Sequence, residues 1–110
     1  LMRFLKEEKA KGKVVLGYGA STKGNVLLQY CGITSEYIAA IAEVNEDKFG
    51  CVTPGTNIPI VSEEDARAMN PDYFVVLPWH FRDFILKKEE AYRKKTKCKF
   101  VFPLPQLEIV

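Results

Sequence analysis

The sequence predicts an α/β fold, a Rossmann-like three-layer sandwich built on a mainly parallel sheet. Short apolar segments alternate with helical segments four times along the chain. The strand segments are apolar throughout, as in strands that are covered on both faces. Since crossovers between parallel strands are right-handed, the intervening helices are expected on both faces of the sheet.

The first half of the chain is predicted to alternate helix, strand, helix and strand. Residues 1–11 place their apolar side chains on one helical face, and the glycine that follows ends this helix. A β-branched apolar run predicts a strand over residues 13–16. Residues 22–31 are expected to form a helix that Ser21 or Thr22 caps and that again ends at a glycine. Turn-forming residues on both sides favour a second strand over residues 38–42.

A turn and a short helix are predicted in the middle of the chain. Pro54-Gly55 is typical of a type II turn, and residues 58–61 are expected to form a short strand at an edge, because they include a proline. The stretch "SEEDARAMN" predicts a helix. Ser62 is expected to cap it, with Asp65 in an acidic variant of the capping box.

The last third repeats the strand and helix pattern. "DYFVVLP" predicts a strand over residues 73–77, and a single long helix is expected over residues 81–95, with an apolar inner stripe and a charged outer face. A strand is predicted over residues 99–102, and the terminal "QLEIV" (residues 106–110) is expected to add a short final strand.

Length and composition indicate one compact domain over residues 1–110. The chain has 110 residues, of which 47% are hydrophobic, and this composition argues against disorder. Because the first residues already have a helical pattern, the chain is expected to be a piece of a longer protein. Its 16 basic and 14 acidic residues are too balanced for a nucleic-acid-binding domain.

Membrane, disulfide and zinc classes are not expected either. No apolar run approaches the roughly 20 residues that a membrane span needs, and no signal-peptide pattern is present. The three cysteines (Cys31, Cys51 and Cys98) are odd in number and lack the spacing of a metal site. Free thiols in a reducing, cytoplasmic environment are the expected state.

A glycine-rich loop joins the first predicted strand to the second helix. In "VVLGYGASTKGN", Gly17, Gly19 and Gly24 would let a ligand approach the backbone. The helix that follows would direct free N–H groups at the same place, and Ser21, Thr22 and Lys23 would add hydroxyl donors and a positive charge. These are the components of an anion or diphosphate site.

Neither named phosphate motif is complete in this loop. Thr22 stands where the dinucleotide fingerprint has its third glycine, and the P-loop pair of lysine and Ser/Thr is missing after Gly24. Two interpretations therefore stay open. The loop either contacts a phosphate or nucleotide, or it is only a tight turn with a helix cap.

Three further residues are candidates at the carboxyl ends of strands. Glu43 follows the second strand at about the distance where an acid binds a ribose hydroxyl in dinucleotide folds; a solvated glutamate is the alternative. Trp79 and His80 follow the strand that ends in "LPWHF". Trp79 would stack on a base or sugar, or fill the core. His80 would contact a ligand or partner domain, or serve only local structure.

The order of these motifs resembles the C-terminal domain of the sugar C-methyltransferases. The resemblance covers residues 12–102 and rests on "GYGASTKGN" with "LLQYCGI", "IAEVNEDKFG", "TPGTNIPI" and "NPDYFVVLPWHFRD". Glu43 stands where the family often has aspartate, and Phe84 where an acidic residue often follows "FRD". The positions that match the family are Gly17, Gly19, Ala20, Ser21, Lys23, Gly24 and Asn25 in the loop, Pro54, Gly55, Ile58, Pro59 and Ile60 in the proline turn, and Pro78, Trp79 and His80.

The resemblance implies a function for the chain. Those enzymes use S-adenosylmethionine to methylate a ketosugar linked to a nucleoside diphosphate, and their C-terminal domain helps to hold the nucleotide-sugar against the methyltransferase domain. No cofactor is then expected in these residues, because S-adenosylmethionine and zinc would bind to upstream domains. The expected partners are the nucleotide-sugar and the upstream methyltransferase domain, and the chain alone is expected to be inactive.

Two alternatives come from other classes of protein. One is an NAD(P)-binding domain of an oxidoreductase, against which the displaced third glycine and Lys23 argue. The other is a purely structural module that keeps the fold for packing or dimer contacts.

Overall fold

The computed structural model describes residues 1–104 and 107–110, except for the side chains of Thr22 and Lys23. Residues 105–106, and with them Gln106 of the predicted last strand, lie outside this description. The sheet has six strands in the order β3-β2-β1-β4-β5-β6. They are β1 (Val15–Tyr18), β2 (Ile41–Glu43), β3 (Ile60–Ser62), β4 (Tyr73–Val76), β5 (Lys99–Phe102) and β6 (Glu108–Ile109).

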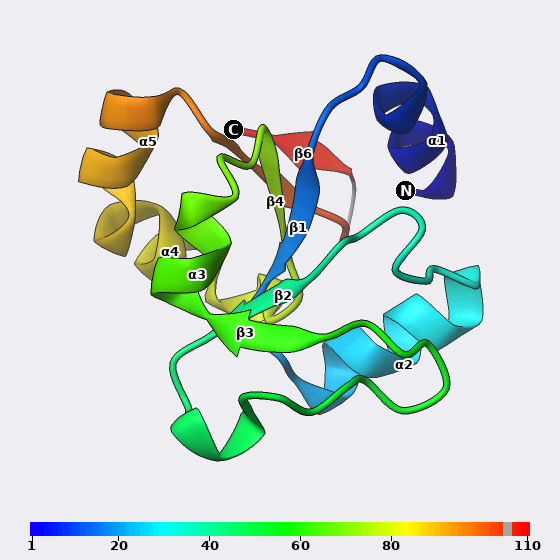
Figure 1. Cartoon of the computed structure of the whole chain (residues 1–110). Helices are drawn as coiled ribbons and strands as arrows, with labels where there is room; N and C mark the ends of the chain where they lie inside the picture. Colours follow the sequence, from blue (N-terminus) through cyan, green and yellow to red (C-terminus); the bar gives the residue numbers. More distant parts are fainter. Residues whose placement is uncertain (105–106) are drawn as a thin grey trace.

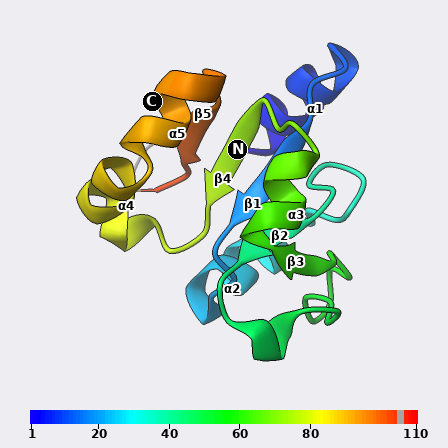
Figure 2. The same ribbon diagram turned by 60° about the vertical axis from the view of Figure 1, so that its left-hand side comes forward.

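The first five strands are parallel, and only β6 pairs antiparallel, with β5. Helices cover both faces, as Figure 1 and Figure 2 show. The helices are α1 (Met2–Ala10) and α2 (Thr22–Cys31) on one face, and α3 (Glu63–Ala68), α4 (Arg82–Lys88) and α5 (Glu90–Thr96) on the other. The predicted Rossmann-like three-layer sandwich is confirmed.

The two faces of the sheet bury different kinds of core. On the side of α1 and α2 the core is mainly aliphatic, with Leu5, Leu28 and Ile41 among its fully buried residues. On the side of α3, α4 and α5 it is largely aromatic, and the rings of Phe74 and Phe100 lie 5.5 Å apart. Because helices cover both faces, the central strands of the sheet are mostly apolar.

Three predicted strands lie two or three residues further along the chain than expected. Residues 13–16 were expected for β1, which spans Val15–Tyr18, and residues 38–42 for β2, which spans Ile41–Glu43. The shift of β2 has a local cause: the amides of Tyr37 and Ile38 both donate to the Thr34 carbonyl and form a turn. β3 begins at Ile60, because Pro59 pairs with Val52 instead, in an isolated antiparallel bridge.

The single long helix expected over residues 81–95 is wrong. A short 3-10 helix, η2 (Trp79–Phe81), leads into α4, and α4 is separated from α5 at Glu89. Glu89 is 5% exposed, and its carboxylate accepts a hydrogen bond from Arg67 of α3 at 2.5 Å. The break occurs at this residue, whose φ of −100° departs from helical geometry.

The predicted caps are confirmed. Ser62 accepts a hydrogen bond from the Asp65 amide at the start of α3. Gly32 ends α2 in the left-handed conformation (φ 68°). Gly55 has a φ of 76°, which the third position of a type II turn requires.

Candidate functional site

The order of the strands places the glycine loop (residues 17–24) at the point where ligands usually bind to this fold. The chain leaves β1 toward β2 on one side, and β4 lies on the other side of β1. In open parallel sheets the crevice at such a reversal, beyond the carboxyl ends of the strands, is the common binding site. The loop after β1 and the residues after β4 meet there.

Close packing accounts for the glycines of the loop. A Cβ atom at Gly24 would lie 2.4 Å from Cβ of Leu77, and one at Gly17, inside β1, would lie 2.8 Å from Cγ1 of Ile41. Gly19 has a φ of 77° and contacts Pro78. The glycines therefore bring α2 close to the end of β4, and they do not by themselves indicate a ligand.

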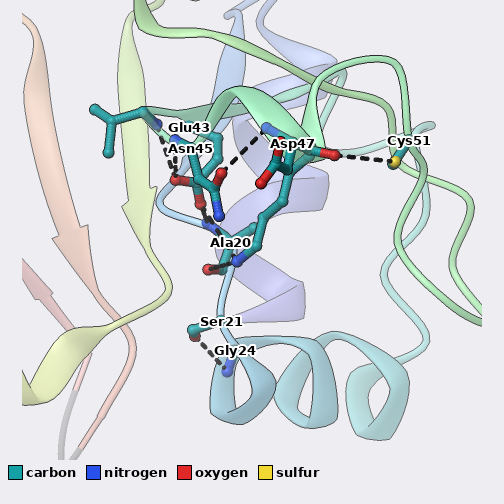
Figure 3. Close-up of polar contacts among 9 residues, drawn as sticks. Ala20, Ser21, Gly24, Glu43, Asn45, Asp47 and Cys51 are labelled. Atoms are coloured by element: carbon teal, nitrogen blue, oxygen red, sulfur yellow. Dashed lines mark hydrogen bonds and ion pairs between the residues drawn. The ribbon is translucent and has the colours of Figure 1, made fainter.

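Of the two hydroxyl residues predicted to cap α2, Ser21 is the cap. Its Oγ accepts a hydrogen bond from the Gly24 amide at 3.0 Å (Figure 3). This contact occupies one of the amides that were expected to face a ligand. The predicted contributions of the side chains of Thr22 and Lys23 lie outside the described residues and stay predictions.

Glu43 and Lys48 hold the loop at Ala20, and Figure 3 shows Glu43 next to Ala20. The Glu43 carboxylate accepts hydrogen bonds from the amides of Ala20 (3.0 Å), Val44 (2.8 Å) and Asn45 (2.9 Å). The ammonium of Lys48 donates to the Ala20 carbonyl at 3.3 Å and lies 3.8 Å from the carboxylate. The Glu43 side chain is only 9% exposed. A ribose hydroxyl, its predicted partner, would have to compete with three amides.

A hollow of about 430 Å³ lies beside this arrangement, between α2, β2 and the proline turn (residues 53–58). Its volume falls in the range of small-molecule sites. Three of the residues predicted from the sequence line it, and so do a lysine and the proline turn. The polar and rim residues are Ala20, Ser21, Asn25, Lys48, Thr53 and Pro54, and the apolar residues are Leu28, Ile41, Ile60 and Leu77.

Sequence reasoning missed Lys48. It lies in the short 3-10 helix η1 (Glu46–Lys48), five positions after Glu43. An ammonium has three N–H donors, and here one meets the Ala20 carbonyl while another faces Glu43. One donor is left for a ligand at the hollow. The only indication in the sequence was an acid and a lysine on either side of a turn, a pattern too common to be specific.

Trp79 and His80 do not line this hollow. Trp79 is half-buried and packs against the aromatic core. Of its two predicted roles, the structure shows the one in the core. His80 is exposed, and its ring lies 4.2 Å from that of Phe81. Contact of either residue with a ligand or a partner domain stays a prediction.

A second, more apolar hollow of about 400 Å³ lies at the same edge, on the α4 side. It includes Pro78 and the side chains of Phe81 and Phe84, which are 55% and 69% exposed. Tyr18 lies beneath, and burial together with the negative charge of Glu89 raises the pKa of its phenol. Phe84 is the position where the family often has an acid, and here it adds to an apolar surface.

A larger hollow, of about 700 Å³, lies at the opposite end of the sheet, where β5 begins. Four lysines and Arg93 line it, and Lys94 forms an ion pair with Glu90 at 3.0 Å. Burial raises the pKa of the Cys98 thiol there to about 11. Because ligands of this fold bind at the carboxyl ends of the strands, we do not regard it as the candidate site.

Two features are absent from residues 1–104 and 107–110. No cluster of three or more His, Cys, Asp or Glu side chains suited to a metal ion occurs within these residues. None of the helices described there is both long and apolar enough to span a membrane.

The fold is that of a Rossmann-like domain with a hollow of small-molecule size at its topological switch point. More specifically, the chain belongs to the family of C-methyltransferase C-terminal domains, which it matches over residues 1–105. It is also 36% identical over 101 residues to the C-methyltransferase NovU of Streptomyces niveus. That alignment covers 92% of this chain and 24% of the relative. The match does not favour the NAD(P)-binding alternative.

The chain therefore spans about a quarter of the length of the curated relative that it matches. The family assignment confirms the resemblance inferred from the motifs. The name of the relative indicates methyl transfer to carbon. This activity is a property of that whole protein.

Proposed function

We propose that this chain is the substrate-holding domain of an S-adenosylmethionine-dependent C-methyltransferase that acts on a sugar linked to a nucleoside diphosphate. The observation that carries the proposal is the hollow of about 430 Å³ between the start of α2 and the proline turn. It lies where this fold binds nucleotides, and the glycine loop forms one wall of it.

The diphosphate would bind at the end of the hollow formed by Ala20 and Ser21. The first turn of α2 carries the positive end of the helix dipole, and Lys48 supplies a cation at the rim. In a favourable, partly buried geometry this electrostatic contribution is up to about 2 kcal/mol. Affinity for the chain alone should then be in the millimolar range, about −4 kcal/mol. Tight binding would need a second domain that closes over the ligand.

The chemistry would take place outside this chain. We place S-adenosylmethionine and zinc on upstream domains of a longer cytoplasmic protein, and the methyltransferase domain is the proposed partner. Two findings support this division: the family is one of C-terminal domains, and three quarters of the matched relative lies outside the alignment. We therefore expect no methyl transfer by the chain alone. Methylation of a nucleotide-sugar by the isolated chain would overturn that part of the proposal.

Titration of the ¹⁵N-labelled chain with uridine diphosphate, followed by NMR, tests the binding. We expect millimolar affinity and amide shifts in residues 17–25 and at Lys48. Lys48→Gln should weaken binding several-fold, because it removes the cation at the rim. Lys95→Gln, a change at an exposed lysine of α5, is the control and should have no effect. Shifts confined to residues 86–99, around the basic hollow, would contradict the proposal.

A further inference from the structure

We propose that the hollow between α2 and the proline turn holds the nucleobase of the ligand, and that the side-chain amide of Asn25 pairs with the edge of that base. The diphosphate then lies at the other end, beside Ala20, Ser21 and Lys48. This inference rests on the proposed function and assigns the parts of the ligand to parts of the site.

The hollow runs along α2 from the glycine loop to the proline turn. Ala20 and Ser21 line it at the start of α2, and Asn25 lies one turn further along the helix. Pro54 also lines it and contacts Gln29, which lies one more turn along α2. The proline turn is fixed to α2, because the side-chain amide of Gln29 donates to the Pro54 carbonyl at 2.7 Å. This hydrogen bond ties the two walls of the hollow together.

Asn25 brings to this hollow a buried side-chain acceptor that is not used within the protein. Its Oδ1 is buried, and among the described residues it has no hydrogen-bond partner. The Thr53 hydroxyl, by contrast, is bonded to the Thr56 hydroxyl and to the Ile58 amide. A buried acceptor without a partner is unfavourable, and a ligand that brings an N–H group to it would remove that cost.

The chemistry of an asparagine side chain fits a base edge. It carries an acceptor oxygen next to an NH₂ donor. The edges of uracil, thymine and guanine present an N–H next to a carbonyl, which is the complementary pattern. Nucleobases are commonly recognised in this way, by hydrogen bonds to their edges.

The walls of the hollow suit a flat ring. Pro54 and Ile60 line it, and Ile60 keeps 7% of its surface exposed. Fully buried aliphatic side chains lie beneath them, so the walls are backed by close-packed core. Apolar walls with a single well-placed polar group are typical of small-molecule sites.

The orientation of the ligand follows from the proposal that the substrate and the methyl donor are held by different domains. The sugar has to be reached by a methyl donor held on another domain, so it must project from this domain at the carboxyl edge of the sheet. The base is the end that does not react. It can be enclosed, and binding energy from such remote groups can position the reacting carbon.

Separate probes for the two ends of the ligand test this inference by NMR. Uridine, thymidine and guanosine carry a base but no phosphate, and inorganic pyrophosphate carries no base. We expect at least one nucleoside to shift the Asn25 side-chain NH₂ and the amides of residues 53–55. Pyrophosphate should shift Ala20, Ser21 and Lys48 and leave residues 53–55 unchanged.

Variants of Asn25 make the test specific. Asn25→Ala should weaken nucleoside binding at least fivefold and leave pyrophosphate binding within twofold. Val26→Ala changes the next residue of α2, which is 59% exposed, and should alter neither. If Asn25→Ala fails to fold, Asn25→Asp keeps the size and places an acid in the first turn of α2, where the helix dipole favours it. Binding of uridine and thymidine should again fall at least fivefold, because a carboxylate has no donor for the carbonyl beside the base N–H.

The outcomes separate this inference from the proposed function. If uridine diphosphate and pyrophosphate shift the glycine loop while no nucleoside reaches residues 53–55, the base assignment is wrong and the substrate-holding function stands. Nucleoside binding that is equal in Asn25→Ala and the parent chain also overturns the assignment. If neither phosphate compound shifts the loop, the proposed function fails, and this inference fails with it.

Discussion

Two segments leave the sheet side by side at its carboxyl edge, and they are built in opposite ways. The glycine loop (residues 17–24) follows β1, and the tryptophan segment (residues 77–81) follows β4. Ser21, Glu43 and Lys48 hold the loop through hydrogen bonds to its backbone. In the tryptophan segment no side chain caps η2 or the α4 that follows, and Phe81 is 55% exposed.

Because of this difference, the two segments at this edge of the sheet are suited to different kinds of contact. A loop whose backbone is fixed by the protein's own contacts is preorganised, so a ligand that binds to it loses little free energy in ordering it. Exposed aromatic rings instead offer apolar surface of the kind that marks interaction sites with other molecules. We therefore expect changes in the loop to cost stability and binding together, and changes at exposed positions beside the tryptophan segment to cost little stability.

The largest effect should come from Gly24→Ala, which forces the two segments apart. The new Cβ would lie 2.4 Å from Cβ of Leu77 and 3.2 Å from its Cα, and neither atom can swing away as the end of a side chain would. We expect a loss of about 3 kcal/mol in the free energy of unfolding, measured by urea denaturation.

The sign of this result is decisive. Without the clash, replacing glycine by alanine inside a helix would stabilise the protein by about 1 kcal/mol. A stabilised Gly24→Ala variant would therefore show that α2 does not approach β4 as described. Val26→Ala in the same helix is exposed and should change stability by no more than about 0.5 kcal/mol.

Glu43→Gln should give the next largest effect, because it tests the contacts that fix the loop. The amide group that replaces one carboxylate oxygen is a donor and would face backbone N–H groups that need an acceptor. We expect a loss of about 2 kcal/mol, the value of a hydrogen bond to a charged group. The exposed Glu46→Gln is the control, with little effect expected. Equal stability of the two variants would contradict the role assigned to Glu43.

Ser21→Ala should cost about 1 kcal/mol through loss of the cap of α2. Ser62→Ala removes the equivalent cap of α3 and should cost about the same. The two variants differ in position, since Ser21 lines the hollow and Ser62 does not. Titration with uridine diphosphate should therefore show weaker binding in Ser21→Ala alone. Weakening by the same factor in both variants would mean that binding follows stability rather than the loop.

The fold could be predicted from the sequence because its determinants are local. Apolar runs, glycines after helices and the Ser62 cap each act over a few residues, and together they predicted most elements to within two or three positions. The long helix over residues 81–95 was wrong for a non-local reason. Glu89 faces inward to Arg67, which lies 22 positions earlier on another helix, and a periodicity analysis does not include such a partner.

The candidate site could be predicted only in part. The loop was located correctly, since the carboxyl end of a first parallel strand is a general binding position. Three of its residues, Ala20, Ser21 and Asn25, do line the hollow. The contacts of Glu43 with the Ala20 amide and the presence of Lys48 at the rim depend on how β2 and η1 lie against the loop. That arrangement is tertiary, so no spacing in the sequence specified it.

The smallest effect on stability is expected from Phe84→Ser, the variant that tests the apolar surface beside the tryptophan segment. Phe84 is 69% exposed, so replacing it should change the free energy of unfolding by no more than about 0.5 kcal/mol. Ile85→Ser, a change at the next residue, which is 3% exposed, is the contrasting control and should destabilise the chain strongly. A large loss in Phe84→Ser would show that this ring belongs to the core of the domain. Unchanged stability would show that Phe84 lies outside the core, because a buried core position does not accept a hydroxyl without cost.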